Sequence, residues 1–465
     1  MAFNPDFQYA PLQSSTSIRV LFVVPGDRDE DIHCWTMPSD LDADHSIFPH
    51  NPKPVHLLSI AEGSAYADST VKKQLTVPRD AYYDEDSDMF INHPFQQYYA
   101  LSYVWGDSTD LQKIILNGQS FSITRNLDAA LRSLRPPKDA QGVWVWIDAI
   151  CINQADLEEK RTQIALMGRI YQQAEYVRAQ VMTTSEHGNN FGELIWSIRT
   201  AAKLYEDAEK ASSSKKLDSD SQGQHSSRNE TKVHQSTDIV GKDDDSQLSE
   251  LNNRSLEQYN LPPEESPLWD SWRQILASPY FRRIWILQEF VLAQDTKMAI
   301  GSFIGKMDIF MTCIHFLQWY SGALDASYLG RGEDSLLKKR SIAGWRGARN
   351  MFRERLRYHR IAGQRQNLLT LLANVHLRSA IDARDMLFAL LGIAADGQQF
   401  MPLVTYREPA NEIFIKFAMK FVEMGGVSEL LQQAANTAWM AGLPSWVPVS
   451  PAMNALLVNS RLMLL

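Results

Sequence analysis

The spacing of apolar and polar positions is most regular between residues 98 and 177, where it predicts an α/β unit. Residues 98–105 alternate between two faces that are both largely apolar, which is typical of a central strand. Two short β-rich runs then meet at Asn117-Gly118, the strongest short-range signal for a hairpin. Leucine and alanine recur at helical spacing over 127–134, so we expect a helix after the hairpin.

The stretch 143–177 continues this pattern with a second buried strand, a loop and a helix. The strand is the short β-branched and aromatic run 143–147. It stops at Asp148, which places a carboxylate at the carboxyl edge of the sheet, where open α/β folds bind ligands. Asp156, with Glu159 three residues later, is a helix-start signal of the capping-box kind. A sheet flanked by helices is therefore predicted.

The rest of the chain divides into regions of different composition. Residues 1–95 contain one clear strand, 18–24, among loops rich in Pro and Asp, and we expect an N-terminal strand and loop extension. The main domain is expected over 96–300. It is interrupted at 206–262, where Ser, Asp, Lys and Gln dominate and too little apolar surface is available to offset the ordering entropy, so this insertion is predicted to be disordered. Residues 301–465 have mostly helical patterns and form a C-terminal region.

Composition narrows the classes of function. The chain has 465 residues, 44% of them hydrophobic, which is ample for a core. Its formal net charge of −9 argues against nucleic-acid binding. An odd number of cysteines, 3, is no disulfide framework and favours a reducing, cytoplasmic location. No apolar run reaches the roughly 18 residues of a membrane span, and the scattered histidines match no zinc spacing, so no metal is expected.

A second block of motifs, SPLWDSWRQILASPYFRRIWILQEFVLAQ at residues 266–294, predicts two helices. Glu289 is an acid within the otherwise apolar second helix. Such a carboxyl group must be paired, partly neutralised or exposed to a cleft. A pair with Arg282 or Arg283 would make Glu289 a structural residue, and the sequence leaves this alternative open.

These blocks, in this order, resemble the fungal heterokaryon incompatibility (HET) domain family. The matching stretches are YYALSYVWGD (98–107), ITRNLDAALRSL (123–134), WIDAICINQADLEEKRTQIALMGRIYQQA (146–174) and FRRIWILQEFVLA (281–293), with DARDMLFALLGIA (382–394) and LPSWVP (443–448) downstream. Two features depart from the family pattern. The strand after residue 174 is usually more apolar than VRAQV, so only a weak strand is expected there, and the insertion is unusually long.

The resemblance implies a fold and a chemistry. HET domains are similar to the Toll/interleukin-1 receptor (TIR) fold, a small flavodoxin-like parallel sheet flanked by helices. TIR enzymes cleave NAD at the nicotinamide–ribose bond with one glutamate, which lies on a helix in a Trp-Cys-x-x-Glu-like context. The run from Trp285 to Glu289 is similar, with Ile286 in place of the cysteine. The resemblance therefore implies Glu289 as the catalytic residue and NAD as a substrate, with no bound cofactor.

Four further residues are candidates for binding that substrate. Asp148 and Asp107 follow predicted strands, and the rings of Trp105 and Tyr103 could stack on a nicotinamide or adenine ring. Cleavage of an N-glycosidic bond passes through an oxocarbenium-like state that a nearby carboxylate stabilises. Structural alternatives stay open for each of them. Asp148 equally suits a cap of the loop backbone, and burial of a tryptophan ring contributes on the order of 2 kcal/mol by itself.

Two functions follow from the resemblance. The first is a fungal nonself-recognition and programmed-cell-death effector that depletes NAD. The second is a non-enzymatic TIR-like scaffold that signals by self-association. A phospho-receiver with Asp148 as acceptor is disfavoured, because no convincing late-strand lysine is present. The expected partners are a second copy, bound through the TIR-like domain, and an unknown protein bound by the C-terminal region, without nucleic acid or a membrane span.

Overall fold

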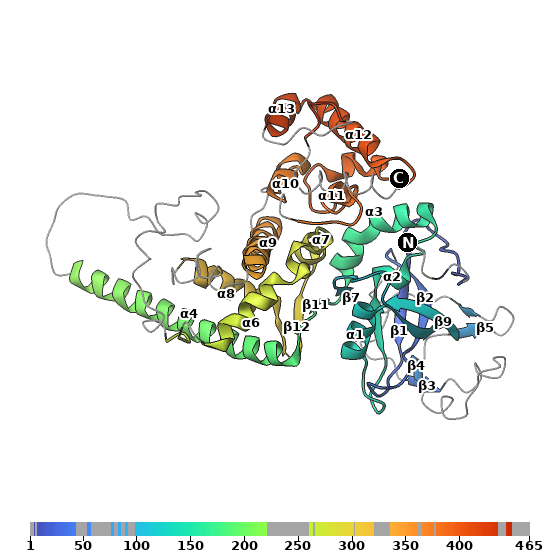
Figure 1. Ribbon diagram of the computed structural model, residues 1–465, viewed down its shortest axis with the longest axis horizontal. Coiled ribbons are helices and arrows are strands. Elements are labelled where there is room, and N and C mark those ends of the chain that lie inside the picture. Colours follow the sequence, from blue (N-terminus) through green and yellow to red (C-terminus); the bar gives the residue numbers. More distant parts are fainter. Residues whose placement is uncertain are drawn as a thin grey trace. The chain divides into compact units, whose positions relative to one another are not determined.

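The computed structural model arranges the chain in two compact units, both drawn in Figure 1. Unit 1 contains Met1–Met182, Arg283–Lys297 and Tyr358–Leu465, and unit 2 contains Thr183–Arg282 and Met298–Arg357. The residues that the structure describes are 4, 7–42, 54–56, 76–78, 82–84, 89–91, 98–220, 260–263, 266–301, 303–319, 335–359, 365–375, 378–435 and 443–448.

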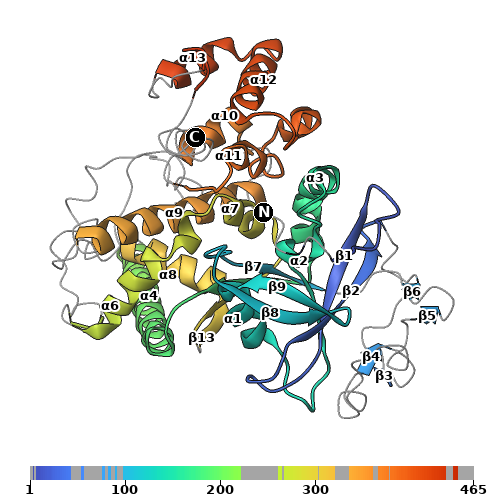
Figure 2. The ribbon, with the colours of Figure 1, turned by 45° about the vertical axis from the view of Figure 1, so that its right-hand side comes forward.

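A sheet forms the centre of unit 1. Its strands are β1 (Ser17–Val23), β2 (His33–Asp40), β7 (Tyr99–Ser102), β8 (Leu111–Leu116), β9 (Gln119–Thr124), β10 (Val143–Trp146) and β11 (Val177–Val181). They follow the order β11-β7-β10-β1-β2-β8-β9. Two further strands are β12 (Thr296–Ile300), which begins in unit 1 and ends in unit 2, and β13 (Phe303–Lys306) of unit 2. Residues expected to form a separate N-terminal extension thus supply two of the central strands. Figure 2 shows β2 beside β8 and β9.

Four short strands form two small sheets of their own. They are β3 (Pro54–His56), β4 (Thr76–Pro78), β5 (Tyr82–Asp84) and β6 (Met89–Ile91). β3 pairs with β4 and β5 pairs with β6, both antiparallel.

The main sheet is mixed, which corrects the expectation of a parallel sheet. β7 pairs in parallel with β10 on one side and with β11 on the other. β1, however, is antiparallel to both β10 and β2, and β8 is antiparallel to β9. The physical reason lies in the connections, since the short links between β1 and β2 and between β8 and β9 cannot make the long crossover that parallel pairing needs.

β2 also pairs in parallel with β8, but only the parallel set β10, β7 and β11 has helices between its strands along the chain. α1 (Arg125–Leu134) precedes β10, and α3 (Leu157–Gln173) joins β10 to β11. In space the first of these strands, β7, lies between the second and the third. The weak strand expected after residue 174 is confirmed as β11. Its polar residues are accommodated, because Arg178 donates to the Ser133 hydroxyl at 2.9 Å and Gln180 is buried.

The hairpin predicted at Asn117-Gly118 is confirmed. The two residues have φ angles of 50° and 77°, both in the left-handed region. A two-residue turn of the I′ type requires positive φ at both positions, and Asn-Gly meets this requirement with little strain. Six residue pairs join the two strands, from Leu111 opposite Thr124 to Leu116 opposite Gln119.

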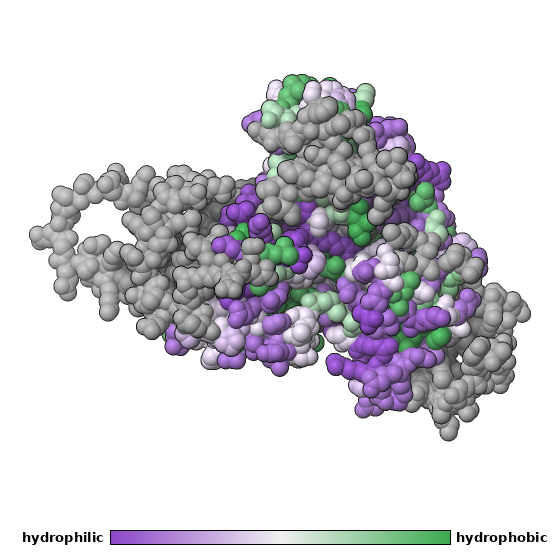
Figure 3. Space-filling model, viewed as in Figure 1, coloured by the Kyte–Doolittle hydropathy of each residue, from purple (hydrophilic) through white to green (hydrophobic). Residues whose placement is uncertain are grey.

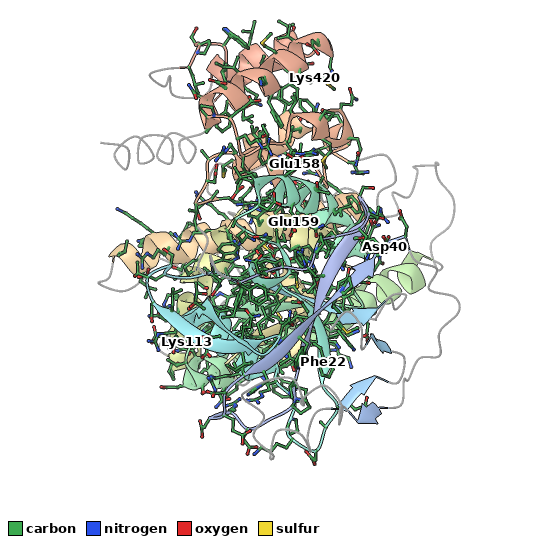
Figure 4. All side chains as sticks on the ribbon, turned by 90° about the vertical axis from the view of Figure 1, so that its right-hand side faces the viewer. Phe22, Asp40, Lys113, Glu158, Glu159 and Lys420 are labelled. Carbon is green, nitrogen blue, oxygen red and sulfur yellow. The ribbon has the colours of Figure 1, made fainter. Side chains whose placement is uncertain are left out.

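The start of α3 realises half of the predicted capping box. The Asp156 side chain accepts hydrogen bonds from the backbone amides of Glu158 and Glu159. The Glu159 carboxylate reaches elsewhere, to the Arg19 guanidinium at 2.6 Å and the Asn153 amide at 2.7 Å. Figure 4 labels both glutamates on this helix. Glu159 therefore ties the helix to β1, while Glu158 remains exposed.

Helices make up the rest of unit 1. They are α2 (Asp148–Cys151), α7 (Trp285–Leu292), α10 (Leu368–Asn374), α11 (Asp385–Phe388), α12 (Ala410–Glu423) and α13 (Val427–Ala435), with 3-10 turns at Gly397–Gln399 and Met401–Leu403. The helical C-terminal part follows the predicted pattern. Apolar side chains are exposed on its last two helices, among them Met419 and Leu431. Figure 3 colours the surface by hydropathy, with hydrophobic residues in green.

Unit 2 is built mainly from helices: α4 (Ser185–Asp220), α6 (Pro267–Ala277), α8 (Met307–Trp319), most of α9 (Ser335–His359) and the 3-10 turn Pro279–Arg282. Its core contains the stacked rings of Phe191 and Trp272, 5.7 Å apart, with Phe310 beside both. α4 passes residue 206, where disorder was expected to start, because the Glu, Ala and Lys that follow favour helix. Residues 221–259 of the expected insertion lie outside the described residues.

Among the helices that the structure describes, none combines the length and the apolarity that crossing a membrane requires.

Candidate functional site

The candidate residues come together at one edge of the sheet in unit 1. β7 and β10 are parallel neighbours, so their carboxyl ends lie side by side. Tyr103 and Trp105 follow β7, and Asp148 opens α2 directly after β10. Helix α7 adds Glu289 from a much later part of the chain. The site therefore unites three segments that are far apart in the sequence.

Asp148 is a buried carboxylate with three donors. It is 7% exposed and accepts hydrogen bonds from the Trp105 indole at 2.8 Å and from the Ala149 amide at 2.8 Å. The Arg283 guanidinium lies 3.5 Å away. Burial raises the pKa of the Asp148 carboxyl, although Arg283 and Trp105 act in the opposite direction. Asp148 thus binds a backbone amide of its own turn and is also a member of the cluster.

Arg283 is the residue around which the cluster is organised. Its guanidinium donates to the Tyr103 carbonyl oxygen, faces Asp148 and lies 5.7 Å from the centre of the Trp105 ring. Burial lowers the pKa of Arg283, but the neighbouring charges of Asp148 and Glu289 raise it overall, so the side chain stays cationic. The sequence suggested Arg283 only as a partner for Glu289. Its position next to an acid-bearing apolar helix was the available signal.

Glu289 is the most deeply buried acid of the group. It is 1% exposed, and burial raises the pKa of its carboxyl from 4.5 to about 7, although the charge of Arg283 and a hydrogen bond from the Ser102 hydroxyl lower it. Its second oxygen, Oε2, has no hydrogen-bond partner among the described residues. Buried polar atoms are nearly always paired, so an unpaired carboxyl oxygen calls for a functional or structural explanation.

The other two candidates have different surroundings. Tyr103 is 2% exposed, its hydroxyl has no hydrogen-bond partner among the described residues, and burial raises the pKa of that hydroxyl well above its usual range. Asp107 is exposed and accepts hydrogen bonds at 2.8 Å from the amide and the hydroxyl of Thr109. These bonds lower the pKa of Asp107. The carboxylate therefore closes its own turn outside the buried cluster.

The chemistry available to this cluster is electrostatic. The Arg283 guanidinium pairs with Asp148 and also feels the charge of Glu289, and burial raises the pKa of the Glu289 carboxyl to about 7, so its charge changes near neutral pH. A carboxylate of this kind can stabilise a developing positive charge. Within the part of the chain that the structure describes, no group of three or more His, Cys, Asp or Glu side chains is arranged to hold a metal ion.

Comparison with known proteins supports the class suggested by the sequence blocks. Residues 98–289, from the start of β7 to the acid of α7, match the family model for Heterokaryon incompatibility protein (HET). The chain is similar to "Heterokaryon incompatibility protein 6, OR allele" of Neurospora crassa, with 26% identity over 392 residues. That similarity covers 76% of this chain and 53% of the relative, so the chain spans about half the length of the curated relative. Both findings are similarities of this chain to heterokaryon incompatibility proteins. No solved structure matches the chain.

Proposed function

We propose that the protein is a heterokaryon-incompatibility effector, acting in fungal nonself recognition and programmed cell death. The family match over 98–289 and the Neurospora relative support the recognition role. The signalling part in this proposal is the α/β portion of unit 1. The C-terminal helical part takes the role of partner recognition, with its exposed apolar side chains on α12 and α13 as the candidate surface.

We further propose that the α/β portion is TIR-like. Its three parallel strands support this, because β7 lies between β10 and β11 and so reproduces the 2-1-3 order with which flavodoxin-like sheets begin. In such sheets ligands bind where the strand order reverses, beyond the carboxyl ends of the strands. Tyr103 and Asp148 occupy that edge.

The proposed activity is hydrolysis of NAD at the nicotinamide–ribose bond. The leaving nicotinamide takes the bonding electron pair and departs neutral, and water adds to the ribosyl cation with loss of a proton. Ionised Glu289 would stabilise that cation. The paired side chains of Arg283 and Asp148 would keep the neighbouring groups of the site in position. The observation that carries this proposal is the buried Glu289 carboxyl, which has a pKa of about 7, one oxygen without a hydrogen-bond partner among the described residues, and the charge of Arg283 acting on it.

A second candidate function is a non-enzymatic scaffold that signals by self-association. The burial of the cluster favours it, because Glu289 is 1% and Asp148 7% exposed, and a substrate would need access to both. In that case Glu289 stabilises the packing of α7, and assembly of copies through unit 1 transmits the signal.

The deciding experiment measures NAD consumption and nicotinamide release by the full-length protein, with a crowding agent to promote assembly. Wild type is compared with Glu289→Gln and with Asp107→Asn, whose carboxylate lies outside the cluster. We expect turnover that rises with pH through about 7 as Glu289 ionises, that is lost in the Gln variant and that is kept in the Asn variant. An assembled, folded wild type without turnover would leave only the scaffold function.

A further inference from the structure

A short segment of the C-terminal part, residues 378–385, holds the residues that open α7. Arg378 is 3% exposed and donates to the carbonyl oxygen of Arg283 at 3.1 Å. The Ile284 amide donates to the Ser379 carbonyl oxygen at 2.9 Å, and a parallel β-bridge joins Arg283 to Ser379. These contacts fix the main chain just before the helix.

Asp385 holds the next residue along. Its carboxylate accepts hydrogen bonds from the Trp285 side chain and from the Tyr406 hydroxyl, the latter at 2.5 Å. Two cationic side chains in turn hold the Tyr406 ring in place. Lys160 of α3 lies 4.3 Å from the ring centre, and Arg384 lies 4.9 Å from it. Three consecutive residues, 283 to 285, are therefore each held by the segment 378–385, which we name the clasp.

The residues held by the clasp determine the geometry of the candidate site. Arg283 carries the guanidinium between Asp148 and the Tyr103 carbonyl oxygen. Trp285 and Glu289 are four positions apart on α7, so they lie on the same face of the helix. A displacement at the start of α7 would move the guanidinium and the Glu289 carboxyl together.

We propose that the clasp positions Arg283 and Glu289, so that the C-terminal part controls the state of the candidate site. Arg378 is a positioning residue in this proposal, because it acts on the site through the main chain of Arg283. The proposal deepens the proposed function and rests on it for its biological meaning, but its geometry is independent of whether NAD is cleaved. A partner bound by the C-terminal part could act on the site through these same contacts.

The test measures the pKa of the Glu289 carboxyl by NMR on full-length protein labelled with carbon-13 at the glutamate carboxyls. Glu289→Gln assigns the signal. Arg378→Met keeps the length of the side chain but removes its donors. The charge of Arg283 lowers the pKa of this carboxyl, and Arg378 holds the main chain of Arg283, so we expect loss of the Arg378 donors to act through Arg283. We expect the pKa to rise in Arg378→Met, by less than in Arg283→Met.

Three comparisons separate positioning from general loss of packing. In the Arg283→Met background, Arg378→Met should add no further rise. Arg378→Lys, which keeps a cationic donor, should restore part of the wild-type value. Arg365→Met is the matched control, because Arg365 also donates to a carbonyl oxygen, that of Ala394 at 2.9 Å, but lies outside the clasp. This variant should leave the pKa of Glu289 unchanged.

A second variant covers the case in which Arg378→Met does not fold. Asp385→Ala removes both acceptor oxygens, so Trp285 and Tyr406 both lose their bonds to this position, and the same rise is expected. An unchanged Glu289 pKa in folded variants, or a rise of equal size in the Arg283→Met background, overturns the clasp. NAD turnover without any such pKa change overturns the clasp alone. A pKa change without NAD turnover by wild type overturns the enzymatic function alone.

Discussion

Replacement of Glu289 by Gln should change how the stability of the fold depends on pH. Burial raises the pKa of this carboxyl from 4.5 to about 7. Unfolding restores the ordinary value, so between these two pH values the folded state keeps a proton that the unfolded state releases. A raised pKa in the folded state means that the contribution to stability is fully present below about 4.5 and is lost as the pH rises through about 7.

The size of this effect follows from the two pKa values. At about 1.4 kcal/mol per pKa unit, the rise from 4.5 to about 7 corresponds to a loss of roughly 3 kcal/mol above neutral pH. At pH 5 the loss is still below about 1 kcal/mol. Gln has nearly the same shape and does not titrate. Between pH 5 and 8 the free energy of unfolding should therefore shift by about 2 to 3 kcal/mol in favour of the Gln variant.

Urea unfolding at pH 5, 6, 7 and 8, followed by far-ultraviolet circular dichroism, measures this difference. The slope of the free energy against urea must stay constant between variants for the comparison to hold. Asp107→Asn is the control, since hydrogen bonds from Thr109 lower the pKa of that exposed carboxyl and keep it ionised throughout this range. Parallel curves for wild type and Glu289→Gln would refute a raised pKa in the folded state.

Three further results are expected. Glu159→Ala leaves the buried Arg19 guanidinium without its carboxylate, so it should lower the free energy of unfolding, measured in urea, by about 3 to 5 kcal/mol. The control Glu158→Ala changes an exposed glutamate and should lower it by less than about 1 kcal/mol. Gly118→Ala forces an alanine to adopt a φ of 77° in the hairpin turn and should cost about 1 kcal/mol in the same assay. Ser102→Ala removes a donor that favours the ionised form of the buried carboxyl of α7, so the pH at which stability falls should move upward.

Local patterns in the sequence were sufficient to place the strands and helices near the site. The hairpin at Asn117-Gly118 and the helix start at Asp156 depend on the chemistry of a few adjacent residues, and both were predicted. Strand pairing depends on distant residues instead. Nothing within residues 17–23 indicates that this strand will lie between β10 and β2 and run antiparallel to both, so the parallel sheet expected from the central motifs was wrong in that part.

The same distinction applies to the candidate site. The sequence placed Asp148 at the end of one predicted strand, and Tyr103 and Trp105 within another, as candidates for one site. That these strands are parallel neighbours, and that β7 ends at Ser102, became clear only from the fold. Besides the direct bond from Trp105 to Asp148, these three residues are joined by Arg283, whose guanidinium meets a carbonyl oxygen 180 positions earlier in the chain and a carboxylate 135 positions earlier. With two acids in view, Glu289 and Asp148, the sequence could not determine which of them the arginine would approach.

The clasp was beyond prediction for a different physical reason. Arg378 lies 95 positions after Arg283, and the group that it binds is a main-chain carbonyl oxygen. Every residue has such an oxygen, so no side chain at either position identifies the pair in the sequence. Asp385 binds the Trp285 side chain, but its neighbour Asp382 is an equally plausible acceptor until the fold is known. Because these contacts fix the residues that carry the guanidinium, a change in the C-terminal part can alter the charge state of Glu289 without touching the carboxyl group.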